Sequence, residues 1–294
     1  MALAVGAGGL AALAAPGGCQ VETTYHCANV VASGGTRTLV LDNLRHSAVD
    51  LDDPTYLEFA YIRAMAAVAD TAFPAGEAID AYHLGAGGLT LPRYLAAERP
   101  GTRSLVSEID GGVVQINREQ LGLDEVPGLD VRVEDGRLGM RRLPDDSRDL
   151  VVGDAFGGVS VPWHLTTREA LSEVQRVLRP DGVYVANLID YGDLAFARAE
   201  VTTMRTVFDY VLIAGDPADV GSASEADGGN LVVIASDRPL PRQAIEASMD
   251  RRATAWIVRD DAGTRAWAGD AQVLTDDYAP VDQLLQPYRA GAAG

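Results

Sequence analysis

Lysine is absent from the 294-residue sequence, so all 24 basic residues are arginines; with 42 acidic residues they give a formal net charge of −18. An acidic balance of this size repels phosphate backbones, and no segment combines clustered arginines with interleaved aromatic residues. The sequence therefore argues against a nucleic-acid partner. Without lysine the chain also has no Walker-type phosphate loop. A cationic small molecule is the better electrostatic match.

Cysteine and histidine are also scarce. The two cysteines, Cys19 and Cys27, stand eight residues apart, a spacing that is typical neither of a metal pair nor of a disulfide framework. We therefore expect a reducing compartment, the cytoplasm. The four histidines are scattered without the spacing of metal ligands, so we predict no metal site. These histidines are His26, His46, His83 and His164.

Charged residues are missing from the first 18 positions, and the first basic residue is Arg37. This segment lacks the positive start of a secretory signal, is broken by Pro16 and falls short of the roughly 20 apolar residues of a membrane span. A lipoprotein cleavage site before Cys19 is disfavoured, because Pro and Gly precede the cysteine. We interpret residues 1–19 as a loosely ordered leader, with a membrane anchor as the alternative.

The remaining sequence has the composition of a globular protein, with 47% hydrophobic and 22% charged residues. Residues 21–41 read as a β-hairpin, and Asp53-Pro54 predicts the start of a helix. From residue 78 onward, apolar strands alternate with helical patterns, which predicts a doubly wound parallel sheet covered on both faces. We expect four segments, namely the leader 1–19, a hairpin and helix element over 20–74, a Rossmann-type domain over 75–240 and a tail over 241–294 that packs on it.

A glycine-rich turn follows the first strand of the predicted sheet, in the sequence His83-Leu84-Gly85-Ala86-Gly87-Gly88. Glycines at this point allow a tight turn and a close approach of the backbone to a ligand. Thr90 stands where a dinucleotide-binding fingerprint has its third glycine, so NAD and FAD are disfavoured.

Carboxylates follow the next three strands. Glu108 and Asp110 end the second strand, 23 and 25 residues after Gly85, where an acid can accept both ribose hydroxyls. Asp135 follows the third strand and Asp154 the fourth. Any one of them could be a helix cap, Asp135 above all, but crowded negative charge favours a compensating cation or a ligand rich in donors. An adenosyl sulfonium satisfies both demands without a phosphate group.

These motifs, in this order, resemble the spermidine synthase family, the polyamine aminopropyltransferases, within the methyltransferase-like Rossmann group. The motifs that carry the resemblance are LVLDN from Leu39, YLE from Tyr56, HLGAGG, SEID, EDG, and GDAFGG followed by VPWHLTTREAL. The resemblance implies a methyltransferase-type doubly wound sheet with a small N-terminal hairpin. It also implies that Gly85, Gly87, Glu108, Asp110, Asp135 and Asp154 bind decarboxylated S-adenosylmethionine or S-adenosylmethionine.

On the acceptor side the sequence departs from the family. Gly88 and Gly157 occupy positions where the family has aspartates, and Leu57 replaces a glutamine. The residues left for substrate binding are Tyr56, Glu58 and His46, the last at a family glutamine position. Another carboxylate could substitute for the missing acids, and the candidates are Asp53, Glu58, Asp276 and Asp277.

The sequence leaves three functions open. The first is transfer of an aminopropyl or related alkyl group to an amine, with Asp154 as the catalytic residue at the junction of donor and acceptor. The others are an S-adenosylmethionine-dependent methyltransferase, which would not need the missing acids, and a catalytically silent homologue that binds an adenosyl ligand. In each case we expect a small-molecule partner, no nucleic acid and no membrane partner, with homodimerisation left open.

Overall fold

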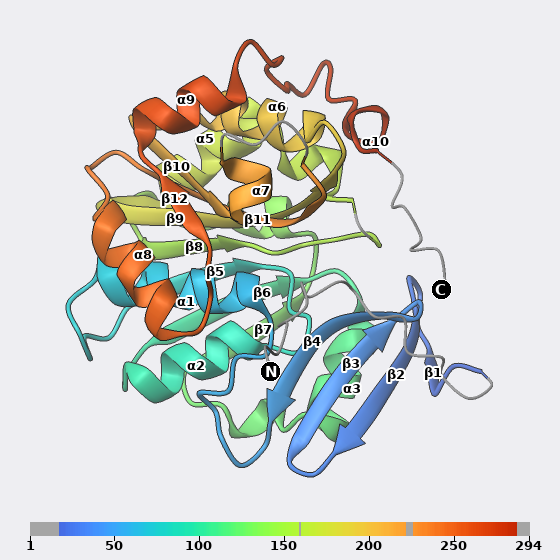
Figure 1. Ribbon diagram of the computed structural model, residues 1–294. Coiled ribbons are helices and arrows are strands. Elements are labelled where there is room, and N and C mark those ends of the chain that lie inside the picture. Colours follow the sequence, from blue (N-terminus) through green and yellow to red (C-terminus); the bar gives the residue numbers. More distant parts are fainter. Residues whose placement is uncertain (1–17, 159, 222–225, 287–294) are drawn as a thin grey trace, which may run out of the picture.

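The computed structural model describes residues 18–158, 160–221 and 226–286, which form a small antiparallel sheet beside a larger mixed sheet (Figure 1). The small sheet has the order β1-β2-β3-β4. Its strands are β1 (Val21–Glu22), β2 (Cys27–Ser33), β3 (Thr36–Leu41) and β4 (Leu44–Asp50). The leader predicted for residues 1–19 lies almost wholly outside the described residues.

The predicted hairpin is present and continues into a further strand, β4. The turn between β3 and β4 consists of Asp42 and Asn43, both at positive φ, as a two-residue type I′ turn requires. The apolar face of this sheet packs against α3 (Gly111–Gln120), where Val113 and Ile116 meet Leu39. The small sheet is thereby fixed beside the glycine-rich turn.

The large sheet has the strand order β12-β10-β11-β9-β8-β5-β6-β7. Its strands are β5 (Asp80–Leu84), β6 (Arg103–Glu108), β7 (Leu129–Val133), β8 (Arg148–Gly153), β9 (Leu178–Tyr191), β10 (Tyr210–Gly215), β11 (Gly228–Ser236) and β12 (Ile257–Arg259). Strands β5 to β9 pair in parallel, as predicted. The prediction of a wholly parallel sheet is wrong at the other end, because β11 pairs antiparallel with both β9 and β10. No long helix separates β10 from β11, so the chain returns directly in the opposite direction.

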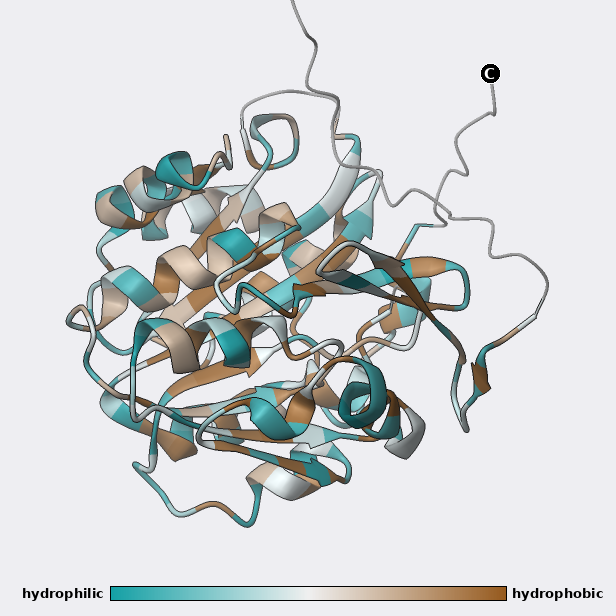
Figure 2. Ribbon diagram, turned by 90° about the horizontal axis from the view of Figure 1, so that it is seen from below, coloured by the Kyte–Doolittle hydropathy of each residue, from teal (hydrophilic) through white to brown (hydrophobic). Residues whose placement is uncertain are grey.

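Helices cover both faces of this sheet, and Figure 2 shows its apolar strands, in brown, running between them. The helices α1 (Ala60–Ala72), α2 (Thr90–Glu98) and α8 (Arg242–Arg251) contribute to the core on one face. On the other face the core includes residues of α4 (Gly136–Met140), α5 (Arg168–Val177), α6 (Ala195–Met204), α9 (Asp261–Ala268) and α10 (Val281–Leu284). The short helix α7 (Pro217–Val220) lies between β10 and β11.

The helix predicted from Asp53-Pro54 begins later, at Ala60. Asp53 instead accepts hydrogen bonds from the backbone N–H and the hydroxyl of Thr55, a local turn that competes with helix formation. The intervening residues 51–59 are irregular, and their last part reaches the edge of the large sheet.

The two cysteines form a disulfide, Cys19–Cys27, so the expectation that they are unpaired is wrong. Antiparallel pairing of Glu22 with Cys27 turns the chain back on itself and brings residue 19 within reach. The predicted reducing compartment rested on unpaired cysteines, and the disulfide removes that support. Across the described residues, no helix combines the length and the apolar character needed to cross a bilayer.

Candidate active site

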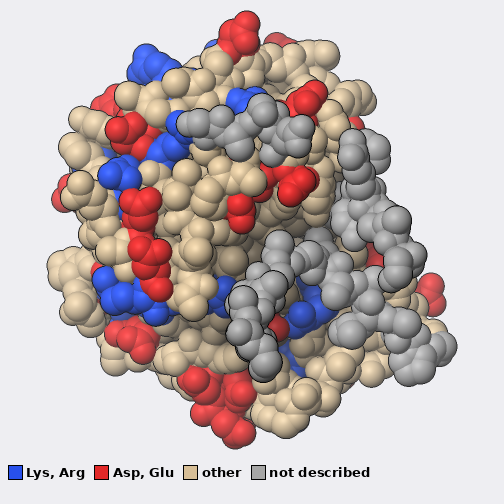
Figure 3. All heavy atoms as spheres, in the orientation of Figure 1, with Lys and Arg blue, Asp and Glu red and all other residues tan. Residues whose placement is uncertain are grey.

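A cavity of about 730 Å³ lies at the carboxyl ends of the central parallel strands. Strand β4 and the first turn of α1 line it on one side, and the segment between β10 and β11 lines its far end. Figure 3 shows a hollow near the centre of this face, with acidic side chains above it and arginine side chains below it. Of the predicted site residues, His46, Glu58, Gly85, Gly87, Glu108, Asp135 and Asp154 line the cavity.

The glycine-rich turn forms one wall of the cavity, and Gly85 and Gly87 both have positive φ angles. A Cβ atom on residue 85 would stand 2.4 Å from the backbone oxygen of Asp154, so a side chain is excluded there. The close contact of these two backbones brings the predicted catalytic carboxylate next to the turn.

Glu108 stabilises this turn from the end of β6. Its Oε2 accepts a hydrogen bond from the backbone N–H of Ala86 and its Oε1 one from that of Asp110, both at 2.8 Å. Burial raises the pKa of Glu108. Each carboxylate oxygen can accept a further bond, so two ribose hydroxyls could still be bound.

Asp110 has a different environment. It is 1% exposed and does not line the cavity. Its carboxylate caps α3 by accepting a bond from the N–H of Gly112 and receives a 2.5 Å bond from the hydroxyl of Thr23. Its observed contacts are therefore structural ones.

Asp135 combines two contacts. Its Oδ1 caps α4 by accepting a 2.9 Å bond from the N–H of Leu138, and its Oδ2 lies 2.9 Å from Nε2 of His164. Both Asp135 and His164 line the cavity. The helix cap that the sequence suggested is present, and the residue still faces the site.

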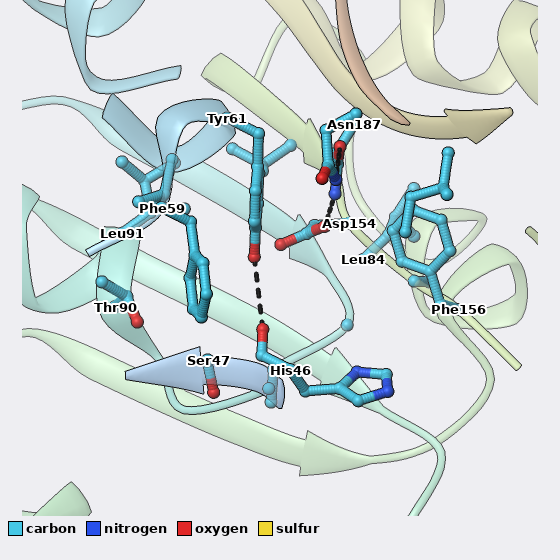
Figure 4. Close-up of a pocket in the computed structure, with 18 of the residues that line it drawn as sticks. His46, Ser47, Phe59, Tyr61, Leu84, Thr90, Leu91, Asp154, Phe156 and Asn187 are labelled. Carbon is cyan, nitrogen blue, oxygen red and sulfur yellow. Dashed lines mark hydrogen bonds between the residues drawn. The ribbon is translucent and has the colours of Figure 1, made fainter. Parts of the chain in front are cut away.

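Asp154 lies at the centre of the cavity wall (Figure 4). Its Oδ1 accepts a 2.9 Å hydrogen bond from Nδ2 of Asn187. Tyr61 lies beside it, and the Tyr61 hydroxyl donates to the backbone oxygen of His46 at 3.4 Å. Burial raises the pKa of Asp154 to about 6, against the opposing effects of Asn187 and Tyr61. Burial of Tyr61, together with the negative charge of the nearby Asp154 carboxylate, raises the pKa of Tyr61 well above its ordinary value. A carboxylate of this kind is a stronger base than an exposed one.

Two of the three predicted substrate residues, His46 and Glu58, line the cavity. Glu58 forms a 2.8 Å ion pair with Arg45 and accepts a hydrogen bond from the hydroxyl of Tyr56. Tyr56 itself does not line the cavity. Burial lowers the pKa of His46 to about 4, so this ring is neutral at neutral pH.

The two positions with missing acids differ in their surroundings. A Cβ on Gly88 would stand 2.5 Å from Oγ of Ser47, whereas a Cβ on Gly157 would meet nothing within 4 Å. Of the acids considered as substitutes, Glu58 lines the cavity but Asp53, Asp276 and Asp277 do not. Asp276 is held instead by Arg137 and Thr167, and its pKa is lowered to about 2, mainly by its bond to Arg137.

Several cavity residues were missed by the sequence analysis. Tyr61 lies in α1, Asn187 in β9 and Asn230 in β11, so none of them belongs to a motif that the sequence analysis singled out. A polar side chain inside an otherwise apolar strand was the signal available at Asn187. At the far end the lining includes Asp216, Asp219 and Asp227, which belong to a segment without a recognisable motif. Among the described residues, no group of three or more His, Cys, Asp or Glu side chains could hold a metal ion.

Comparison with known proteins gives related sequences. No protein-family model matches the chain. A polyamine aminopropyltransferase of Vibrio vulnificus is 28% identical over 216 residues, which are 68% of each chain. A polyamine aminopropyltransferase of Chromobacterium violaceum is 28% identical over 141 residues, 48% of this chain and only 53% of that relative.

Solved structures extend the comparison. A probable spermidine synthase from Corynebacterium glutamicum matches with a TM-score of 0.81 and 27% identity, over 93% of this chain and 100% of that one. A spermidine synthase in complex with the transition-state analogue AdoDATO has a TM-score of 0.54 and 16% identity, over 90% and 84%. Human methyltransferase-like protein 13, in complex with SAH, has a TM-score of 0.50 and 16% identity, over 76% and 97%.

The last two likenesses concern the fold alone, whereas the Corynebacterium structure and the curated relatives agree with the chain in sequence as well. The chain is therefore similar in sequence to spermidine synthase-like proteins and has a methyltransferase-type fold.

Proposed function

We propose that the protein is an aminopropyltransferase that moves an aminopropyl group from an adenosyl sulfonium, decarboxylated S-adenosylmethionine, to a small-molecule amine. The observation that carries this proposal is a single cavity in which the glycine-rich turn, Glu108 and the buried carboxylate of Asp154 share one wall. The relatives named polyamine aminopropyltransferase support the reaction class.

The residues present fit an adenosyl ligand. The turn at Gly85 and Gly87 leaves room for close backbone approach, and Glu108 has free acceptor capacity for ribose hydroxyls. Asp135 lies further along the same wall, where it would contact the adenine ring. The AdoDATO and SAH complexes of the neighbouring folds support an adenosyl group as the ligand class.

When bound, the sulfonium supplies a carbon made electrophilic by the adjacent positive sulfur. The amine nitrogen forms a bond to this carbon while the carbon–sulfur bond breaks, and the bonding pair stays on sulfur as a neutral thioether. Asp154 takes the proton that the amine must lose, either before attack or as the new bond forms. Asp154 lies beside the glycine-rich turn, so a donor bound at this turn would have its reacting carbon close to the base.

The acceptor side of the cavity favours a cationic amine. Glu58 lines this part, and the far end adds the carboxylates of Asp216, Asp219 and Asp227. Arg45, which also lines the cavity, is paired with Glu58, so its charge is compensated. Because Arg45 neutralises Glu58 in turn, the negative charge that remains for an ammonium group is that of Asp216, Asp219 and Asp227.

The proposal is tested with purified protein, decarboxylated S-adenosylmethionine and a panel of amines that includes putrescine. We expect 5′-methylthioadenosine and an aminopropylated amine to appear in equal amounts. Asp154→Asn is expected to lower turnover by about 10²-fold or more while still binding 5′-methylthioadenosine. Donor binding without methylthioadenosine formation on any amine would overturn the proposal, as would methyl transfer from S-adenosylmethionine with release of S-adenosylhomocysteine.

A further inference from the structure

Three polar side chains form a row across neighbouring strands of the large sheet, on the face covered by α1. Asp154 follows β8, Asn187 lies in β9 and Asn230 lies in β11. Asn187 pairs with Val232 and Asn230 pairs with Ile189, so the two asparagines are diagonal neighbours on one face. All three side chains line the cavity, and they lie where the surrounding strand residues are apolar.

Hydrogen bonds connect the row in one direction. Nδ2 of Asn230 donates to Oδ1 of Asn187 at 3.0 Å, and Nδ2 of Asn187 donates to Oδ1 of Asp154 at 2.9 Å. The second of these bonds is drawn in Figure 4. Because the side-chain oxygen of Asn187 accepts the bond from Asn230, the amino group of Asn187 must face the carboxylate of Asp154.

The order of this row has a chemical consequence. An asparagine amide has one acceptor end and one donor end, and Asn187 is only 3% exposed. If its amide turned over, its oxygen would meet an oxygen of Asp154, and that contact is favourable only when Asp154 carries a proton. A fixed amide orientation therefore favours the ionised carboxylate, which is the form that can accept a proton.

We propose that Asn230 is a positioning residue, which fixes the amide of Asn187 so that Asp154 is kept as an ionised hydrogen-bond acceptor facing the substrate. Asn230 is hydrogen-bonded to Asn187 and acts on Asp154 through it. The inference rests on the proposed function only in that the ionised carboxylate of Asp154 is taken to act as the catalytic base. The orientation of the amide and its effect on the carboxylate can be measured without any turnover.

The other titratable groups around Asp154 come from the elements packed on the same side. They are Tyr61 of α1, His46 of β4 and His83 of β5. Tyr61 lies beside the carboxylate and donates to the backbone oxygen of His46, whereas the His46 and His83 rings are kept neutral because burial lowers their pKa values to about 4 and about 3. These groups are unchanged in the variants used below.

The test is a double-mutant cycle read by carbon-13 NMR of aspartate carboxyl groups. The Asp154 signal is identified by its loss in Asp154→Asn, and its titration midpoint is measured in the wild type, Asn230→Asp, Asn187→Leu and the double variant. An ionised residue 230 can only accept, so Asn187 must turn its amino group toward it and its oxygen toward Asp154. We expect the midpoint to rise by about one pH unit or more, tenfold in the proton equilibrium.

The double variant separates orientation from plain repulsion. If Asn187 transmits the effect, Asn230→Asp in the Asn187→Leu background moves the midpoint by much less than in the wild-type background. Equal shifts in the two backgrounds would show that the new charge acts through space, and would overturn the proposal. Gln243→Glu, which adds the same charge on an exposed residue of α8, is the control and leaves the midpoint unchanged.

Two further measurements keep the test decisive. Asn230→Ala, which adds no charge, is expected to move the midpoint upward by a smaller amount, and an unchanged midpoint would count against the proposal. Calorimetric binding of 5′-methylthioadenosine is expected to stay within about twofold of the wild type in each variant, since none of them changes Glu108 or the glycine-rich turn. If the wild-type protein shows no turnover, the proposed function is wrong, but the titration of Asp154 still tests the role of Asn230.

Discussion

The carboxylate of Glu108 accepts a 2.8 Å hydrogen bond from the backbone N–H of Ala86, between the two glycines of the turn. The residue assigned to the donor's ribose therefore also holds the loop that the donor must approach. A second bond, from the N–H of Asp110, fixes the other carboxylate oxygen. Substitution of Glu108 removes both a ligand contact and the support of the loop.

Glu108→Gln is accordingly expected to weaken binding of 5′-methylthioadenosine by about 1 to 3 kcal/mol, because one charged acceptor is replaced by a donor that faces an N–H group. Isothermal titration calorimetry measures the change. Glu119→Gln, the same substitution on the exposed surface of α3, is the matched control. An affinity equal to that of the control would mean that the carboxylate has no part in donor binding.

Asp154 predicts a pH dependence of activity. Its pKa is raised to about 6 by burial, and only the ionised form can accept a proton from the amine. Turnover is expected to fall tenfold per pH unit below about pH 6. A profile of kcat/KM against pH measures this fall in activity at acidic pH. If the residual activity of Asp154→Asn falls in the same way, the fall is caused by another titrating group.

The same group affects stability, with the opposite sign to an aspartate such as Asp276, whose pKa is lowered in the folded protein. The pKa of Asp154 is higher in the folded protein than its usual value of 3.8, so the folded state binds more protons between about pH 4 and pH 6. Its contribution to stability is full below pH 4 and is lost as the pH rises through 6, a change of about 2 to 3 kcal/mol. We expect Asp154→Asn to gain stability relative to the wild type over this range in urea denaturation. A constant difference between the two proteins would contradict the raised pKa.

Much of the large sheet could be predicted because most of its strands contain a short apolar run between turn residues, and alternation with helices is a local pattern. The end of the sheet could not be predicted in the same way, since the direction of β11 depends on a pairing with β9 far along the chain. The disulfide was missed for a similar reason. The distance between Cys19 and Cys27 is decided by the turn of the β1–β2 hairpin and not by their spacing.

Most of the predicted site residues that end or closely follow a strand line the cavity, because strand ends converge at one edge whatever the side-chain contacts are. Glu108, Asp135 and Asp154 reach the cavity in this way. Asp110 has the same kind of position but turns away to cap α3. Asn230 could not have been found, because its relevance comes from a diagonal contact with a residue 43 positions away.

Gly88→Asp tests whether the family's loop acid can be restored. A Cβ at residue 88 would stand 2.5 Å from Oγ of Ser47, so we expect the single substitution to destabilise the fold by about 1 to 3 kcal/mol through overpacking. Ser47→Ala removes the clashing oxygen and should recover much of this loss. Urea unfolding of both single variants and the double variant measures the coupling.

Gly157→Asp is the control for this pair, because a Cβ at residue 157 meets nothing within 4 Å and residue 157 is not at positive φ. It should leave the free energy of unfolding nearly unchanged. Equal destabilisation by Gly88→Asp with and without Ser47→Ala would show that the clash with Ser47 is not what excludes a side chain at residue 88.

The Cys19–Cys27 disulfide closes a short loop that reaches the site from outside the large sheet. Within this loop, the hydroxyl of Thr23 donates to Asp110, directly beyond Glu108, and His26 lines the cavity. Reduction is expected to lower the stability of this hairpin by about 2 to 3 kcal/mol, the chain-entropy value for a loop of this length. Because the loop contacts the donor side, 5′-methylthioadenosine should also bind more weakly in dithiothreitol.

The double variant Cys19→Ser/Cys27→Ser should bind as weakly as the reduced protein and show no response to dithiothreitol. If the wild type binds equally well in oxidised and reduced form, the loop has no role in organising the donor side of the cavity.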